Sequence, residues 1–285
     1  MSATVSAIVV SYFTGPLLGR VLGALKAQPE IAEIILVDNG NWPNAIEEAL
    51  AANAGGPPVE VLTGHGNAGF AAGCNLGAAR AKGAFLLFLN PDAIMPEGGV
   101  ARMLSEGAAL KRPWLMGAKI IDPEGGEQQG SRRAVLTPWR AFVEAARIYK
   151  LAPRHPYFRR FNLHDEPCPA ETIETDVISG ACFFLPQEDY FAIGGMDEAY
   201  FLHVEDVDFC IRFLAAGGRV YFNPHVAVTH YKSSSRANAM RVEFRKTVSI
   251  LRYFRRHFRD AYPPGFLWLV AGVLWLVFAA KAARR

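Results

Sequence analysis

Several features that mark other classes of protein are scarce or missing in this sequence. Its 285 residues include only four cysteines, widely spaced and without a C-x-x-C pair, so free thiols in a reducing cytosol are expected. The N-terminal MSATVSAIVV has neither the charged leader nor the cleavage site of a secretory signal. No internal repeat is visible. The composition, 51% hydrophobic, excludes a disordered or fibrous protein and indicates a globular chain with one large core.

Charge is nearly balanced overall but uneven along the chain. The formal net charge is +3, with 30 Lys and Arg against 27 Asp and Glu. Residues 236–285 contain eleven Lys and Arg and two acidic residues, so the rest of the chain is acidic overall. A basic end on an acidic body indicates an anionic surface as a partner of the tail alone. Nucleic acid is not expected, because the basic residues are interleaved with an apolar segment and no recognition module is visible.

The tail also carries apolar residues in a regular pattern. Over residues 239–259 one helical face is apolar and another is basic: Phe244, Val248, Leu251, Phe254 and Phe258 against Arg241, Arg245, Arg252, Arg256 and Arg259. After Pro263 and Pro264, residues 265–280 contain no charge, but this run is shorter than the ~20 residues that cross a bilayer comfortably. Its two tryptophans and basic flanks favour a helix that lies in, or dips into, the cytoplasmic leaflet. A hairpin of core helices or an oligomer contact is the alternative.

These patterns divide the chain into two parts. We expect a globular domain over residues 1–235, followed over residues 236–285 by an amphipathic helix and a hydrophobic helix that associate with the inner face of the plasma membrane. Within the domain, residues 132–172 are rich in Arg, Pro and aromatic residues and have weak periodicity. We interpret them as an insertion that is mobile or faces a substrate.

The first half of the domain alternates between short apolar stretches and helical ones. VSAIVVSY, EIILVDNG, VEVLTG and AFLLFLNPD are typical of buried strands, and helical patterns separate them, one over residues 69–81. This alternation predicts an α/β fold with a mostly parallel central sheet flanked by helices. In such sheets ligands bind beyond the carboxyl ends of the strands. Polar groups fall at four of these ends: Ser11 and Tyr12, Asp38, the loop 64–69, and Asn90 with Asp92.

The loop GHGNAG, residues 64–69, matches the dinucleotide fingerprint G-x-G-x-x-G, so a nicotinamide-dependent nucleotide-sugar enzyme is one hypothesis. The loop follows the third strand rather than the first, and no acidic residue ends the next strand about 20 residues on. No Tyr-x-x-x-Lys pair, which such enzymes would be expected to carry, occurs in the chain. A tight strand-to-helix turn explains the glycines equally well. The role of Asp38 is open in a similar way, because this residue suits either a turn or a contact to a base or ribose.

NPD, residues 90–92, is a candidate metal site. Pro91 fixes the backbone so that Asn90 and Asp92 can project toward one point. A hard divalent cation that carries a diphosphate needs one or two carboxylates and leaves its other positions to water and phosphate oxygens. His230 closes the strand VAVTH before KSSS and is the most plausible second protein ligand, although a lone histidine is more often structural.

The stretch FLHVEDVDFCIR places three carboxylates within four residues. The apolar residues around them recur with a helical spacing that stops at Gly217 and Gly218. Asp208 lies four residues before Arg212, so an ordinary i,i+4 ion pair would account for it. Glu205 and Asp206 follow an apolar run instead, where a carboxylate is costly unless it has a partner or a task. Complementing the helix dipole is the simpler explanation.

The ordered series IVVSY, ILVDNG, GNAGFAAGCNLG, FLFLNPDA, ISGACFFL, GGMDEAYFLHVEDVDFCIR and VTHYKSSS resembles the family 2 glycosyltransferases, in the branch of rhamnosyl- or galactofuranosyl-type transferases. The resemblance covers residues 5–235. It implies a GT-A fold, a nucleotide-diphosphate sugar donor, a divalent metal, Mn²⁺ or Mg²⁺, and inversion at the anomeric carbon.

The resemblance also assigns roles by position. The base contact falls to Asp38, the nucleotide pocket to Asn67, Phe70 and Asn75, the metal to Asp92 and His230, the catalytic base to Asp206 and acceptor binding to Glu205. Asn90 stands where the family has the first Asp of its Asp-x-Asp motif. With Ser11 and Tyr12, it is expected at the nucleotide-sugar site.

The expected function is an inverting transfer of a sugar, with rhamnose as one candidate, from a dTDP or UDP donor to a hydroxyl of a lipid-linked saccharide in cell-surface polysaccharide synthesis. Asp206 would remove the proton of the acceptor hydroxyl as it attacks. Two alternatives remain at this point: a nicotinamide-dependent nucleotide-sugar oxidoreductase, and a non-catalytic scaffold that binds glycans or membranes.

Overall fold

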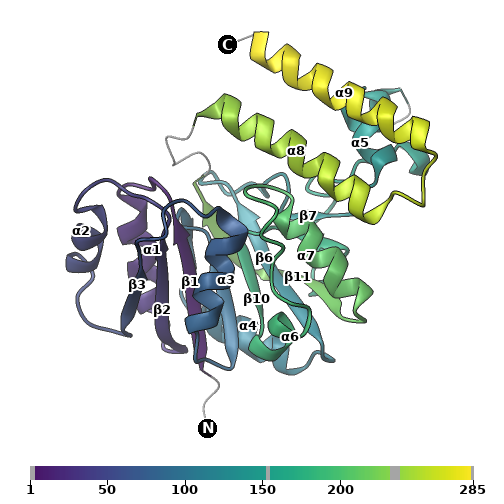
Figure 1. Ribbon diagram of the computed structural model, residues 1–285. Helices are drawn as coiled ribbons and strands as arrows, with labels where there is room; N and C mark the ends of the chain where they lie inside the picture. Colours follow the sequence, from purple (N-terminus) through teal and green to yellow (C-terminus); the bar gives the residue numbers. More distant parts are fainter. Residues whose placement is uncertain (1–3, 152–154, 232–237, 284–285) are drawn as a thin grey trace.

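The computed structural model describes residues 4–151, 155–231 and 238–283 (Figure 1). The main sheet contains β1 (Val5–Ser11), β2 (Ile31–Asp38), β3 (Val59–Leu62), β4 (Phe85–Leu89), β5 (Ala93–Ile94), β6 (Trp114–Ile121), β8 (Ile173–Glu174), β10 (Cys182–Pro186) and β11 (Arg219–His230). A separate pair is formed by β7 (Arg132–Arg133) and β9 (Val177–Ile178). The helices are α1 (Leu17–Lys26), α2 (Ala45–Ala51), α3 (Phe70–Arg80), α4 (Gly99–Ala108), α5 (Pro138–Ala145), α6 (Gln187–Ala192), α7 (Glu205–Ala215), α8 (Ala239–His257) and α9 (Pro264–Ala283), with 3-10 turns η1 (Ile148–Lys150) and η2 (Pro156–Phe158).

The sheet has the order β3-β2-β1-β4-β10-β6-β11-β5, with β8 paired to β11. β1 runs parallel to β2 and β4, β2 to β3, and β6 to β11. β10, β5 and β8 run antiparallel to their neighbours. The predicted α/β fold with a mostly parallel sheet is confirmed, and β10 makes its centre mixed.

Helices cover both faces of the sheet, which explains why the strands read as continuous apolar runs. All seven residues of β1 are buried, and alternate side chains enter opposite cores. Ile8 and Val10 pack in the core that α3 and α7 cover. Ala7 and Val9 pack in the core that α1, α2 and α4 cover. The predicted helix over residues 69–81 is α3, which lies along the first of these faces (Figure 1).

The two tail helices lie beyond the carboxyl ends of the parallel strands (Figure 1). α5, from the segment 132–172, lies beside them. The ring of Phe266 in α9 has its centroid 6.2 Å from that of Trp139 and 6.1 Å from that of Phe142, both in α5. The segment that we expected to be a mobile or substrate-facing insertion therefore includes a helix that packs against the tail. Residues 152–154 within it lie outside the described residues, as do residues 232–237, which contain KSSS and the expected domain boundary.

The amphipathic pattern of residues 239–259 forms a helix, α8, as predicted, but its faces are used differently. Only part of the apolar face enters the core, because Phe244 and Val248 stay 47% and 43% exposed. Part of the basic face packs on the domain, since the guanidinium of Arg245 lies 3.5 Å from the ring centroid of Phe201. Not all the arginines of α8 are therefore available to an anionic surface.

Helix α9 is longer than the uncharged run alone suggests. Gly265–Ala283, with a mean hydropathy of 2.0, is long and apolar enough by length and composition to cross a membrane, and only 6% of its window is buried among the described residues. Trp268 and Leu276 are each 71% exposed. This exposure argues against the alternative in which the run is a core helix.

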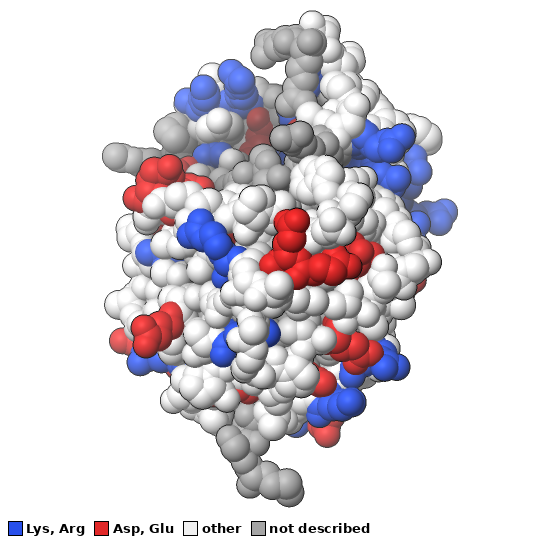
Figure 2. Space-filling view, turned by 90° about the vertical axis from the view of Figure 1, so that its left-hand side faces the viewer, with Lys and Arg blue, Asp and Glu red and all other residues white. Residues whose placement is uncertain are grey.

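Charged side chains on the face nearest α2 occur in small separate groups of both signs (Figure 2). The excess of positive charge lies instead in α8, whose sequence AMRVEFRKTVSILRYFRRH contains a single acidic residue. The basic residues of the tail therefore lie beyond the carboxyl ends of the strands, at the same end of the sheet as the candidate site.

Candidate active site

Asp206 lies in the first turn of α7 and is held by three donors. Its Oδ1 accepts a hydrogen bond of 2.8 Å from the backbone N–H of Val207, and its Oδ2 accepts one of 3.1 Å from the N–H of Gly180. Arg133 of β7 also donates to Oδ2. The Asp206 side chain is 14% exposed. The carboxylate is therefore fixed in one orientation at a helix N-terminus but remains accessible.

Glu205 and Asp206 have opposite protonation tendencies. Burial alone would raise the pKa of Asp206, but the charge of Arg133 and the hydrogen bonds from Arg133 and two backbone N–H groups lower it. Burial, with the Asp206 charge beside it, raises the pKa of Glu205 from its ordinary 4.5 to about 8. Among the described residues, Glu205 Oε2 is buried without a hydrogen-bond partner. The two shifts run in opposite directions, so Glu205 favours its protonated form and Asp206 its ionised form.

The loop before α7 packs directly on the glycine-rich loop. The backbone N–H of Phe70 donates to the carbonyl of Phe201 over 2.9 Å. A Cβ at Gly69 would lie 2.6 Å from that carbonyl oxygen, and the Gly69 φ is +91°. The last glycine of GHGNAG is therefore required by close packing and backbone conformation. His203 and Val204, directly before α7, both have positive φ, at 67° and 73°.

A second centre forms where β4 and β11 end. Asn90 follows β4, Asp92 precedes β5, and His230 ends β11, which pairs with β5. His230 Nε2 lies 3.1 Å from Asp92 Oδ1 and 3.3 Å from Asn90 Nδ2. The His230 and Asp92 side chains are 14% and 11% exposed. The structure thus brings together the three residues that the sequence proposed for a metal-diphosphate site.

Gln128 sets the tautomer of His230. Its Nε2 donates to the carbonyls of Ile121, at 3.2 Å, and His230, at 2.6 Å. Its Oε1 therefore faces His230 Nδ1, 3.0 Å away, and only a protonated Nδ1 can donate to it. In the neutral ring, Nε2 then presents a lone pair toward the carboxylate of Asp92. A cation between Nε2 and Asp92 Oδ1, which are 3.1 Å apart, would accept a lone pair from each, and Asn90 Nδ2 lies 3.3 Å from the same nitrogen.

This arrangement fits a divalent cation. Two neighbouring ligands of an octahedral ion at roughly 2.1 Å are about 3 Å apart, which agrees with the distance between His230 Nε2 and Asp92 Oδ1. The part of the chain that the structure describes contains no group of three or more His, Cys, Asp or Glu that could hold a metal. The protein would supply two ligands, so diphosphate and water would fill the other positions.

Two consecutive residues connect the two carboxylate centres. The N–H of Gly180 donates to Asp206, and the carbonyl of Ala181 accepts from the N–H of Asn90 over 3.0 Å. Adjacent Cα atoms are about 3.8 Å apart. The backbone that enters β10 therefore supports both centres, which lie at one edge of the sheet.

Two residues that orient these centres were missed from the sequence. Gln128 lay in no predicted element, and Arg133 fell in the segment interpreted as an insertion. The available signal was the Arg132-Arg133 pair close to an apolar strand, since adjacent arginines there need acidic partners. Arg132 binds Glu127, with both side chains at most 8% exposed. One short stretch after β6 thus orients His230 through Gln128 and Asp206 through Arg133.

The ends of β1 and β2 form a polar corner. Ser11 and Asp38 are paired in register. Asp38 Oδ1 accepts from the N–H of Gly40 at 2.9 Å and from Asn41 Nδ2 at 2.8 Å, while Ser11 Oγ donates to Asn41 Oδ1 at 3.1 Å. Tyr12 continues from Ser11 and is partly exposed. These contacts are those of a turn, and a nucleotide contact from Asp38 stays a prediction.

The residues assigned to the nucleotide pocket have different settings. Asn67 is exposed in the glycine-rich loop, and Phe70 is partly buried at the start of α3. Asn75 donates to the carbonyl of Met196 and to the Glu198 carboxylate, both at 2.9 Å, and accepts from the Met196 N–H at 3.0 Å. Both ends of its amide are therefore used to tie α3 to the loop after α6. These contacts give no support to the expected nucleotide contact of Asn75.

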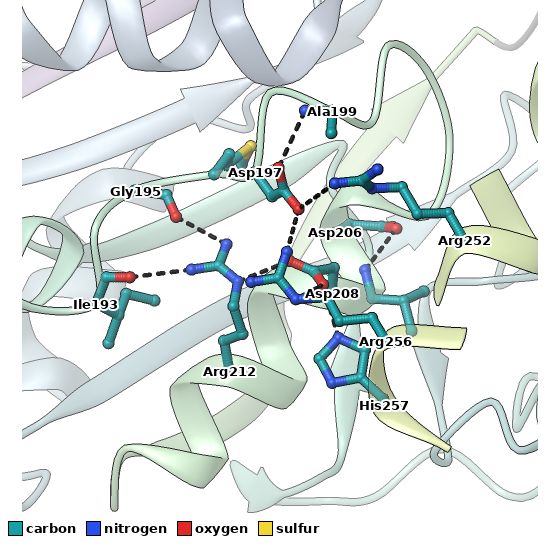
Figure 3. A network of polar contacts seen from close by, with 12 residues as sticks. Ile193, Gly195, Asp197, Ala199, Asp206, Asp208, Arg212, Arg252, Arg256 and His257 are labelled. Carbon is teal, nitrogen blue, oxygen red and sulfur yellow. Dashed lines mark hydrogen bonds and ion pairs between the residues drawn. The ribbon is translucent and has the colours of Figure 1, made fainter. Parts of the chain in front are cut away.

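Asp208, the third carboxylate of the stretch, is structural. It is completely buried, and its two oxygens lie 2.7 Å from Arg212 Nε and from His257 Nε2 (Figure 3). The predicted i,i+4 ion pair with Arg212 is confirmed. Figure 3 also shows Arg252 and Arg256 of α8 at the carboxylate of Asp197. The first turns of α7 are thus connected to the last turns of α8.

Comparisons with known proteins agree with this geometry. Residues 6–144 match the family model described as glycosyl transferase family 2. The chain is 26% identical over 250 residues to the N-acetylglucosaminyl-diphospho-decaprenol L-rhamnosyltransferase of Mycobacterium tuberculosis, covering 82% of this chain and 78% of that protein. It is 23% identical over 269 residues to the rhamnosyltransferase WbbL of Escherichia coli K12, covering 87% and 92%.

The fold is shared with solved structures. The crystal structure of GalNAc-T7 with UDP, GalNAc and Mn²⁺ superposes with a TM-score of 0.61 at 17% identity, covering 96% of this chain and about half, 54%, of that one. The predicted GT-A fold is confirmed, and the nicotinamide-dependent alternative is not favoured. Taken together, the family match and these relatives show that the chain is similar to family 2 glycosyltransferases, with rhamnosyltransferases among its relatives over most of its length, and they support a glycosyltransferase.

Proposed function

We propose that this glycosyltransferase transfers rhamnose, with inversion, from a dTDP or UDP donor to a hydroxyl of a lipid-linked saccharide in cell-surface polysaccharide synthesis. The names of the relatives support rhamnose as the sugar and a polyprenyl-diphosphate saccharide as the acceptor class. The observation that carries the proposal is the support of both carboxylate centres by Gly180 and Ala181. A donor diphosphate at one centre and an acceptor hydroxyl at the other would then lie at the same sheet edge.

Asp206 acts as the general base in this proposal. Its lowered pKa keeps it ionised at neutral pH, so it is ready to accept a proton. Transfer of the acceptor proton to Asp206 leaves the hydroxyl oxygen to form the new bond to the anomeric carbon as the bond to the diphosphate breaks. Glu205, whose raised pKa favours the protonated form, is the proposed acceptor-binding residue beside Asp206.

Asp92 and His230 hold the divalent cation in this proposal, with Gln128 fixing the ring of His230. A cation bound there stabilises the negative charge that develops on the departing diphosphate. Asn90 stays within hydrogen-bond distance of His230 and orients its own amide toward the same point. Ser11, Tyr12, Asp38, Asn67 and Phe70 are the proposed nucleotide-sugar contacts at the neighbouring strand ends.

The exposed face of α9 attaches the enzyme to the cytoplasmic leaflet in this proposal. Vesicle sedimentation of a double variant, Trp268→Asp with Leu276→Asp, tests this attachment, because both side chains are 71% exposed and the changes should leave folding intact. Loss of sedimentation with phosphatidylglycerol vesicles is expected. Unchanged sedimentation would reject α9 as the anchor.

Nucleotide binding tests the transferase proposal most directly. We would titrate detergent-solubilised full-length protein with UDP, dTDP, GDP and NAD, with and without Mn²⁺, by calorimetry. Binding of dTDP or UDP that depends on Mn²⁺ is expected. Binding of NAD without any of the pyrimidine nucleotides would overturn the proposal.

A further inference from the structure

A groove of about 750 Å³ lies between α8, α9 and the loop before α7. This volume falls within the ~300–1,000 Å³ range of small-molecule sites. Five residues of α8 line it, from Val248 to Arg256, at spacings of three and four that place them on a single face of the helix. Trp275 of α9 and Ala199 of the loop line its other sides. The groove is therefore a joint feature of the tail and the catalytic domain.

One end of the lining is cationic. Arg252 and Arg256 are 48% and 42% exposed and share the carboxylate of Asp197. Arg255 is exposed and has no acidic partner within the described parts of the chain. Arg256 also lies 3.9 Å from the buried carboxylate of Asp208, which pairs with Arg212, so three guanidinium groups against the carboxylate of Asp197 leave the groove positive. Guanidinium groups bind phosphate oxygens through paired hydrogen bonds, so the complementary ligand is a phosphate or diphosphate.

The rest of the lining is apolar. Val248 and Trp275 remain 43% and 37% exposed, and Leu251 is partly buried beside them. A site with arginines and apolar side chains on one helix face suits an amphiphile with an anionic head and a hydrocarbon chain. A flat bilayer is served by a different surface, since Trp268 and Leu276 are more exposed and do not line the groove.

We propose that this groove binds the diphosphate and the first isoprene units of the polyprenyl-diphosphate that carries the acceptor saccharide, an inference that rests on the proposed function. The wall residue Ala199 precedes Asp206 by seven residues, so the two lie at most roughly 25 Å apart. Arg252 and Arg256 reach from α8 to the same loop, beside the start of α7 (Figure 3). A lipid diphosphate held there would direct its saccharide toward Asp206.

Binding of farnesyl diphosphate to the detergent-solubilised full-length protein tests the proposal. We would compare wild type with Arg255→Gln, and with Arg241→Gln as the matched control, because Arg241 is an exposed arginine of α8 that does not line the groove. Arg255→Gln should weaken farnesyl diphosphate binding roughly tenfold or more, and Arg241→Gln should not. A second pair tests the apolar part: Val248→Asp should weaken binding, whereas Leu276→Asp, outside the groove, should leave it unchanged.

Three results would overturn the proposal. Inorganic pyrophosphate or farnesol could bind as tightly as farnesyl diphosphate, the Arg255 and Val248 variants could bind like wild type, or Arg255→Gln could weaken binding to phosphatidylglycerol vesicles as much as binding to farnesyl diphosphate. Mn²⁺-dependent dTDP or UDP binding, measured on the same samples, should be unchanged in all four variants. If the wild type bound farnesyl diphosphate but neither dTDP nor UDP, the proposed nucleotide-sugar donor would be rejected, whereas the proposed lipid-diphosphate site would not.

Discussion

The two carboxylates Asp92 and Asp206 lie at the same edge of the sheet but have opposite electrostatic partners. Asp206 already faces a fixed cation, the guanidinium of Arg133. Asp92 faces the ring nitrogen of His230, whose other nitrogen is committed to Gln128. A carboxylate with a permanent cation beside it has little affinity for another, whereas a carboxylate beside a lone pair favours one. We therefore propose Asp206, kept ionised by Arg133, as the base and Asp92 as a metal ligand.

The largest expected effect tests the proton centre. Asp206→Asn keeps the shape but removes the base, so the transfer rate should fall by roughly 10²–10⁴-fold. Mn²⁺-dependent dTDP or UDP binding, measured by calorimetry, should be unchanged, because the proposed metal ligands are Asp92 and His230 and not Asp206. If the variant lost nucleotide binding but kept its turnover at saturation, the two centres would have been assigned the wrong way round.

The next effect tests the metal centre. His230→Ala removes a proposed metal ligand, so it should weaken the Mn²⁺ affinity of the nucleotide complex strongly. Loss of a residue that only hydrogen-bonds to a metal ligand costs roughly 10–100-fold, and the loss of the ligand itself should exceed this. A titration of Mn²⁺ at saturating nucleotide measures it. The histidine His225 of the same strand, outside the centre, provides the control as His225→Ala. Equal Mn²⁺ affinity in wild type and the His230 variant would remove this residue from the site.

A smaller effect is expected from the residue that orients the histidine. Gln128→Leu removes the acceptor for His230 Nδ1 and the donor to its carbonyl, so Mn²⁺ affinity should fall roughly 10–100-fold. Gln128→Glu retains an acceptor for Nδ1 and should restore part of that affinity. A merely structural role for Gln128 would lower the melting temperature of both variants without this difference in Mn²⁺ titrations.

The smallest effect concerns stability and pH. The folded protein binds the Glu205 proton more tightly than the unfolded chain, so this group stabilises the fold fully below pH 4.5 and its contribution is lost as the pH rises through about 8. Glu205→Gln should flatten this part of the dependence of the free energy of unfolding on pH. Urea unfolding between about pH 5 and pH 9 measures it. Glu47→Gln, at an exposed glutamate of α2, should leave the slope unchanged.

Much of the fold could be predicted from local pattern. The helices α3 and α8 and the strands that end at Ser11, Asp38 and Leu89 follow from periodicity and from the polar residues at or after the end of each apolar run. The direction of β10 could not be predicted in this way, because a short apolar run carries no information about whether its neighbours run parallel or antiparallel. Strands of two residues, such as β5 and β7, are too short to show any period.

The site residues likewise differ in whether local sequence could predict them. Strand ends placed Asp92 and His230 near each other because parallel strands share an edge, and that proximity is confirmed. The partners of Gln128 and Arg133 could not be predicted, since His230 and Asp206 lie 102 and 73 residues away in the sequence. Asn75 was assigned to the nucleotide pocket by the family resemblance, and its orientation depends on a loop that packs against it.

Val204 at φ 73° gives the start of α7 a further property. A β-branched residue in the left-handed region is a genuine outlier, and such a conformation costs about 1–3 kcal/mol. The helix has no side-chain cap that would relieve this cost. The strained backbone before Asp206 therefore lies between two fixed contacts. One is the hydrogen bond of Phe70 to the Phe201 carbonyl, and the other is the ion pair of Arg133 with Asp206. The two contacts hold this strained backbone in place, so both help to fix the orientation of Asp206.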